Sequence, residues 1–180
     1  MSRDSEPYVT NTLQWIQTFI IPLNICPFAK REIDKGTVRL EVSPAENSNS
    51  AQKELIKEYQ LLDDNPFIPT TLVIYCGLFT DFYDYLDFLD LANTNLIAQG
   101  YEGIYQLASF HPQYCFANTD YDDVTNYTNR SPYPMIHILR EAQLDEAIQW
   151  YGDTQQIPLN NMNKLRELGL NALKKLVFTR

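Results

Sequence analysis

FHPQYCFANTDYDDVTNYTNRSPYPMIHILRE, residues 110–141, is the stretch around which the rest of the chain is organised. It contains both histidines of the protein, His111 and His137, together with three aspartates and two arginines. Residues 104–110 and 134–140 alternate in side-chain character and predict two strands. The connection between them is long, and compact domains seldom carry such a loop without a functional reason.

Outside this stretch, strands and helices are predicted to alternate. The sequence TTLVIY, residues 70–75, is apolar and β-branched almost throughout, which is typical of a strand buried on both faces. Residues 37–42 alternate apolar with charged side chains and predict a half-exposed strand. Apolar residues spaced by three and four predict helices over residues 7–21, 51–62, 80–99, 141–151 and 160–177.

This order of elements predicts an α/β fold, with α+β as the alternative. We expect residues 1–6 to form a flexible tail and residues 7–180 to form a single globular domain. The domain would hold a mixed sheet of about four strands flanked by helices, with the long loop between strands three and four. A thioredoxin-like fold shows a similar order, although its cysteine motif is missing here and the long loop separates the last two strands.

Charge and cysteine usage exclude several classes of protein. The 23 acidic residues outnumber the 14 basic ones, giving a net charge of −9, which argues against nucleic-acid binding and against binding to anionic membranes. The three cysteines form no CxxC pair, as expected in a reducing compartment. The first residues lack the apolar core of a signal peptide. We therefore expect a cytoplasmic protein, and the sequence leaves open whether it forms a homo-oligomer.

His111 and His137 are the first candidates for catalysis. If strands three and four are neighbours, both imidazoles could share one cleft and act as acid, base or metal ligand. Together with Asp122 or Asp123 they would form a two-histidine, one-carboxylate set, which suits zinc or iron. The spacing matches no known metal signature. The alternative is that each histidine is a core residue that hydrogen-bonds a carbonyl group.

Two arginines are the candidates for substrate binding. Arg130 and Arg140 could each hold a carboxylate or phosphate through paired hydrogen bonds. Arg130 lies among hydrogen-bonding side chains that include Asn126, which we count with it. The alternatives are that Asp122 or Asp123 holds Arg130 and that Glu141 pairs with Arg140.

Cys26 is a second candidate nucleophile, because a lone cysteine with histidines elsewhere in the chain can be catalytic. Lys30, four residues later, could lower the pKa of Cys26 and is counted with the substrate-binding candidates. The alternative is a buried structural cysteine, the role also expected of Cys76 and Cys115. The chain has no glycine-rich phosphate loop, and no cofactor can be identified from the sequence.

Four strings resemble a known family: LNICPFAK (residues 23–30), FHPQYCF (residues 110–116), DDVTNYTNRSPYP (residues 122–134) and HILRE (residues 137–141). They resemble the uncharacterised, mainly bacterial proteins of domain-of-unknown-function family 1415, from about residue 13 to residue 169. The departure is Cys115, where the family pattern suggests a polar residue such as glutamine. The resemblance implies no reaction, substrate or cofactor.

The residues favour a small cytoplasmic enzyme that acts on a small polar or anionic molecule. His111 and His137 would supply acid–base or metal chemistry, and Arg130 and Arg140 would hold the substrate. A non-catalytic binding or scaffold domain and a metal-binding protein are the alternatives. An enzyme predicts that His111, Asp123, Arg130 and His137 line one concave pocket, whereas a scaffold predicts that they are paired internally.

Overall fold

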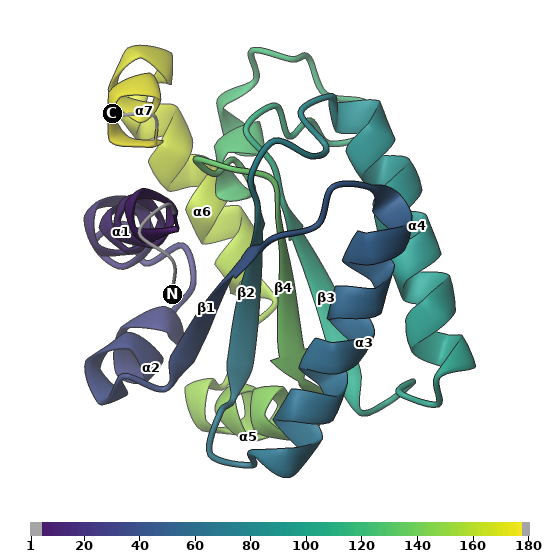
Figure 1. The fold of residues 1–180 in the computed structure, drawn as a ribbon. Coiled ribbons are helices and arrows are strands. Elements are labelled where there is room, and N and C mark those ends of the chain that lie inside the picture. The colour runs from purple at the N-terminus through teal and green to yellow at the C-terminus, as the bar shows by residue number, and fades with distance from the viewer. Residues whose placement is uncertain (1–4, 178–180) are drawn as a thin grey trace.

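A four-stranded mixed sheet forms the middle layer of the computed structural model, which describes residues 5–177 (Figure 1). The strands lie in the order β1-β2-β4-β3 and are β1 (Val38–Ser43), β2 (Thr70–Tyr75), β3 (Tyr105–Phe110) and β4 (Met135–Arg140). β1 runs parallel to β2, and β4 runs antiparallel to both β2 and β3. The predicted α/β domain with its long loop between the third and fourth strands is confirmed. β1 lies at an edge of the sheet, where a thioredoxin-like fold has an inner strand, so that alternative is wrong.

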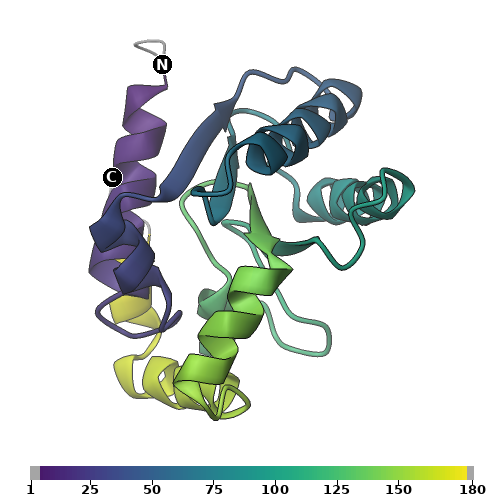
Figure 2. The same cartoon turned by 90° about the horizontal axis from the view of Figure 1, so that it is seen from below.

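Two long helices cover one face of the sheet (Figures 1 and 2). α3 (Ser48–Asp64) begins at Asn47, which forms a capping box with Ser50, and α4 (Phe82–Ala98) begins at Asp81, whose carboxylate accepts backbone N–H groups. The apolar faces of α3 and α4 pack on the side chains that β2 and β4 direct to this face of the sheet. The core of this face includes Leu55, Tyr59, Val73, Tyr75, Tyr85, Phe88, Ile136 and Ile138.

The opposite face is covered by both ends of the described chain. α1 (Glu6–Trp15) continues into a π-helical turn, η1 (Ile16–Ile20), and packs beside α6 (Gln156–Leu168) and α7 (Leu170–Val177) (Figure 1). The core of this face includes Trp15, Phe19, Leu72, Ile74, Met135, Leu165 and Leu173. Every residue of β2 is buried, as are Met135, Ile136 and Ile138 of β4, which is typical of inner strands covered on both faces.

Several local predictions need correction. A short helix, α2 (Ala29–Lys35), lies in a segment where no helix was predicted, and Gly36 ends it with a left-handed φ of 68°. The single helix expected over residues 160–177 is broken into α6 and α7 at Gly169. There φ is 75°, and an added Cβ would meet nothing within 4 Å, so backbone conformation and not close packing requires this glycine.

The remaining elements lie at the ends of the sheet. α5 (Glu141–Tyr151) follows β4 directly, and a 3₁₀ turn, η2 (Val124–Thr128), gives the long loop its own regular structure. The predicted tail covered residues 1–6, but Glu6 is already the first residue of α1. Residues 1–4 of that tail and residues 178–180 of the predicted domain lie outside the described part of the chain. Among residues 5–177, no helix combines the length and apolar character needed to cross a membrane.

Candidate functional site

The sheet separates the two histidines. His137 lies directly opposite Leu72 in the antiparallel β2–β4 pair, so both side chains project to the face covered by α1 and α6. His111 follows β3, and its ring lies 5.1 Å from the rings of both Phe82 and Tyr85, on the α4 face. Strands β3 and β4 are neighbours as expected, but the imidazoles do not share a cleft.

His111 connects two loops through both of its ring nitrogens. Its Nε2 lies 2.8 Å from the carbonyl oxygen of Phe79, and its Nδ1 accepts the backbone N–H of Gln113 at 3.0 Å. A carbonyl oxygen can only accept, so Nε2 carries the proton and the imidazole is neutral. The residue is fully buried, and this burial lowers its pKa. His111 thus holds the turn after β2 against the start of the long loop.

His137 makes a hydrogen bond within the sheet. Its Nε2 lies 2.5 Å from the hydroxyl oxygen of Thr70, and that hydroxyl donates to the carbonyl of Ile138 at 2.6 Å. Because the single hydroxyl proton of Thr70 is used, Nε2 must be the donor to Thr70. Burial lowers the pKa of His137 to about 4. The ring is therefore neutral near pH 7 and has a partner inside the fold.

Arg130 is buried inside the long loop, with 2% of its surface exposed. Its guanidinium lies 4.6 Å from the ring centre of Tyr121 and 4.7 Å from that of Tyr127. Nε donates to the carbonyl of Tyr114 at 3.0 Å, and Nη2 donates to that of Tyr121 at 2.6 Å. No carboxylate among residues 5–177 lies within 4 Å of it, so neither Asp122 nor Asp123 holds it in the predicted way.

Arg140 stabilises the turn between α3 and β2. Its guanidinium donates to the carbonyl oxygens of Leu62, Asn65 and Ile68, the last at 3.0 Å. Cations near a helix C-terminus satisfy its free carbonyls in this way. In the described part of the chain it forms no ion pair with Glu141, the alternative partner.

Asn126 is the centre of the long loop. Its Oδ1 accepts the backbone N–H of Phe116 at 3.0 Å and the hydroxyl of Thr119 at 2.9 Å, and its Nδ2 donates to the carbonyl of Asp120 at 2.9 Å. The residue is fully buried. A side chain that uses its donors and its acceptor internally is a structural element of the loop.

The two aspartates differ in their surroundings. Asp123 precedes η2 and accepts the backbone N–H of Thr125 at 2.8 Å and its hydroxyl at 2.7 Å. These hydrogen bonds lower the pKa of Asp123. Asp122 is exposed at the surface of the loop. Asp123 therefore caps a turn, and it does not reach either histidine.

Cys26 and Lys30 do not form the predicted pair. Burial raises the pKa of the Cys26 thiol, although the backbone N–H groups of Phe28 and Ala29 act in the opposite direction. Lys30 is exposed and forms an ion pair with Asp34 at 2.5 Å. No group of three histidine, cysteine, aspartate or glutamate side chains within residues 5–177 is arranged to hold a metal ion.

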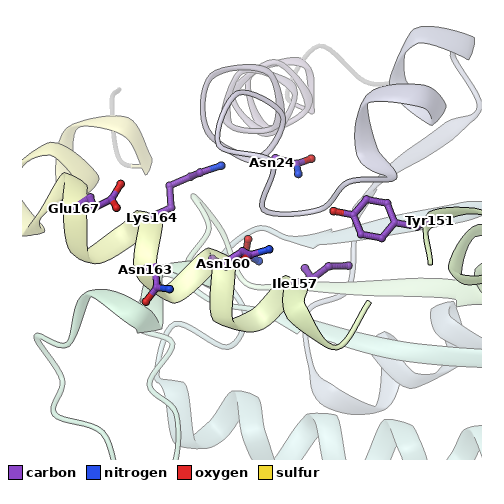
Figure 3. Close-up of a pocket in the computed structure, with 8 residues that line it drawn as sticks. Asn24, Tyr151, Ile157, Asn160, Asn163, Lys164 and Glu167 are labelled. Atoms are coloured by element: carbon purple, nitrogen blue, oxygen red, sulfur yellow. The ribbon is translucent and has the colours of Figure 1, made fainter. Parts of the chain in front are cut away.

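A pocket of about 310 Å³ lies elsewhere, between the loop at residues 21–28 and α6 (Figure 3). It is lined by Asn24, Tyr151, Ile157, Asn160, Asn161, Asn163, Lys164 and Glu167. Nζ of Lys164 donates to the carbonyl of Leu23 at 2.6 Å, and Nδ2 of Asn161 donates to that of Ile25 at 2.8 Å. These two bonds fasten α6 to the loop and fix the walls of the pocket.

This pocket was not predicted from the sequence. Two sequence features could have indicated the pocket. The run NNMNK at residues 160–164 gives a helix an unusual set of amide side chains, and Asn24 lies just before the Cys-Pro pair. Asn24 has a left-handed φ of 52°, a conformation that asparagine tolerates better than most residues. The two segments lie far apart in the sequence, so only the packing of α6 against the loop joins them.

Comparison with known proteins identifies a family. No curated protein and no solved structure matches the chain significantly. Residues 8–175, nearly the whole chain, match a family model, in agreement with the strings that carry the resemblance. The chain belongs to the family described as "Protein of unknown function (DUF1415)".

Proposed function

We propose that this protein is a non-catalytic binding domain and that it takes a small polar molecule in the pocket between residues 21–28 and α6. The observation that carries the proposal is the pair of hydrogen bonds from Asn161 and Lys164 to the loop, because they pre-form the pocket. Its volume of about 310 Å³ lies at the lower end of the range of about 300–1,000 Å³ typical of ligand pockets.

The predicted catalytic groups are paired inside the protein, which supports a non-catalytic binding domain. His111, Arg130 and Asp123 each make hydrogen bonds inside the long loop or its neighbours. His137 bonds Thr70 on the other face of the sheet. This is the arrangement expected of a scaffold, in which polar side chains of a loop satisfy one another.

A library of small polar molecules, screened by two-dimensional amide NMR, tests the proposal. Binding in the pocket should shift the backbone amide signals of Asn24, Asn160 and Lys164 together. Shifts confined to the long loop, around His111 and Arg130, would contradict the proposal and support an enzyme site there. A library that shifts neither set would also count against it.

An enzyme acting on a small anionic molecule is the second candidate, and the observation that favours it is Arg130. A buried guanidinium that is held by carbonyls and rings, without a carboxylate within 4 Å in the described chain, keeps a positive charge that an anion could neutralise. His111 and Asp123 would then be the acid–base candidates of the same loop.

Titration with inorganic phosphate and with acetate tests the second candidate. The expected result is saturable binding that Arg130→Lys weakens while Arg166→Lys, an exposed control on α6, leaves it unchanged. If Arg130→Lys binds phosphate and acetate as tightly as Arg166→Lys does, Arg130 is ruled out as the anchor of an anionic substrate.

A further inference from the structure

We infer that the pocket between residues 21–28 and α6 binds an uncharged polyhydroxylated molecule, a sugar or cyclic polyol; this inference rests on the proposed function. The charge of the lining favours an uncharged ligand. The lining contains one cation, Lys164, and one anion, Glu167, and Lys164 already donates to the carbonyl of Leu23. A phosphate or carboxylate would need more positive charge than this, inside a protein of net charge −9.

The position of the pocket along α6 also disfavours an anion. Most of the lining side chains of α6 come from Asn160 to Glu167, beyond the first turn of the helix, which begins at Gln156. The partial positive charge of a helix acts only near its first turn. The helix therefore supplies amide side chains to the ligand and little electrostatic attraction for an anion.

Carboxamides dominate the lining. Asn24, Asn160, Asn161 and Asn163 each carry an acceptor oxygen and an NH₂ group with two donors. Neighbouring hydroxyl groups of a sugar both donate and accept, so they match this alternation of donors and acceptors. A purely donating or purely accepting ligand would leave half of these groups unpaired.

Asn161 gives the most specific indication. The residue is 7% exposed, and its Nδ2 bond to the carbonyl of Ile25 fixes the plane of the amide. No hydrogen bond from residues 5–177 reaches its Oδ1, which belongs to a residue of the pocket wall. An acceptor without an internal partner, on a nearly buried residue of the pocket wall and held in one orientation, is suited to receive a ligand hydroxyl.

The apolar part of the lining fits the carbon skeleton of such a ligand. Tyr151 stands at one end of the pocket, opposite Glu167, and Ile157 lies beside it (Figure 3). The ring of Phe28 meets that of Tyr151 edge to face, with centres 5.8 Å apart, and so steadies it. A steadied aromatic ring and one aliphatic side chain can pack on the C–H face of a sugar ring without requiring a larger apolar ligand.

The test is amide NMR titration of the protein with three sets of probes. The first is glucose, galactose, ribose and myo-inositol; the second is their anionic counterparts, a glucose phosphate and glucuronate; the third is N-acetyl-alanine methylamide, a neutral amide without hydroxyls. We expect a member of the first set to bind saturably and to shift the amide signals of Asn24, Asn160 and Asn163.

Matched variants locate the binding. Asn160→Ala and Asn163→Ala remove exposed amides that make no hydrogen bond to other described residues, so they should fold normally. Each should weaken binding roughly two- to tenfold, the effect of one lost hydrogen bond. Asn171→Ala removes an exposed amide of α7 outside the pocket and should leave the dissociation constant unchanged.

The outcomes separate the two proposals. Binding in the pocket by only the anionic probes or only the methylamide overturns the polyol inference and leaves the proposed binding function standing. Binding of a neutral polyol that Asn160→Ala and Asn163→Ala do not affect overturns the inference as well. If neither these probes nor the polar library shifts the pocket signals, both proposals are overturned.

Discussion

At the scale of single residues, the polar side chains of the long loop stabilise structure. Arg130 and Arg140 both bind backbone carbonyl oxygens, where the sequence predicted anionic ligands. Asn126 satisfies three separate groups of its own loop. A loop of this length has many backbone groups that need partners once it packs against the domain, and these side chains provide them.

Replacement of Arg130 by lysine should destabilise the protein. Lysine cannot reproduce the planar fork that bonds the carbonyls of Tyr114 and Tyr121 at once, nor stack as guanidinium does over the rings of Tyr121 and Tyr127. We expect the free energy of unfolding to fall by about 2–4 kcal/mol, measured by urea denaturation. Arg166→Lys, at an exposed position, is the control, and a change for Arg130→Lys no larger than that of the control would contradict the structural role.

His137 should make stability depend on pH. Its pKa of about 4 in the folded protein lies below the value of about 6.5 in the unfolded chain. The unfolded chain therefore binds more protons between these values, so the stability that neutral His137 contributes is complete above pH 6.5 and is lost as the pH falls toward 4. The full loss would be at most about 3 kcal/mol.

The His137→Gln variant isolates this effect, because glutamine keeps an N–H donor for Thr70 but does not titrate. His111, whose pKa is also lowered, is present in both proteins and cancels in the comparison. Urea denaturation at several pH values between 4 and 7 should show a shallower decline for the variant. Parallel curves for the two proteins would show that His137 keeps an ordinary pKa.

At the scale of elements, the contact between α6 and the loop at residues 21–28 is the feature on which the pocket depends. The loop follows the π-helical turn η1, and such turns often mark functional sites. Asn161 and Lys164 of α6 donate hydrogen bonds to carbonyl oxygens of the loop. The loop is therefore ordered by a distant helix, since Asn161 and Ile25 are 136 positions apart in the sequence. The pocket therefore exists only while α6 is docked.

Loss of either bond should loosen the loop. Asn161→Ala and Lys164→Met each remove one hydrogen bond to a loop carbonyl, worth about 1 kcal/mol. We expect faster hydrogen exchange of the amides at residues 21–28, by roughly fivefold for each variant. Asn163→Ala, on the same helix but without a bond to the loop, is the control. Unchanged exchange in both variants would show that apolar packing alone orders the loop.

The break between α6 and α7 depends on the backbone of Gly169. With φ at 75° and ψ at 162°, this residue occupies a region that side chains disfavour, and an added methyl group would meet no atom within 4 Å. Gly169→Ala should therefore destabilise through backbone strain alone, by about 1–3 kcal/mol. Thermal unfolding measures this, with Asn171→Ala as the control; a neutral effect would mean that the two helices can join.

At the scale of the whole molecule, the sheet decides which side chains can meet. β4 inserts between β2 and β3, and successive residues of a strand point to opposite faces. His137 therefore faces the α1 and α6 layer, while His111, just beyond the neighbouring strand, turns toward α4. The sequence places the two histidines on neighbouring strands, but their side chains lie on opposite faces of the sheet.

The sequence by itself determined the α/β class, the four strands, most helices and the long loop, because periodicity and capping residues act over a few neighbouring positions. It also identified the family through its unusual strings. Tertiary structure alone decided the strand order, the partners of Arg130 and the pocket beside Asn24. Hydrogen bonds and pockets depend on which distant segments pack together, and side-chain chemistry alone does not specify whether a polar group will face a ligand or a backbone carbonyl.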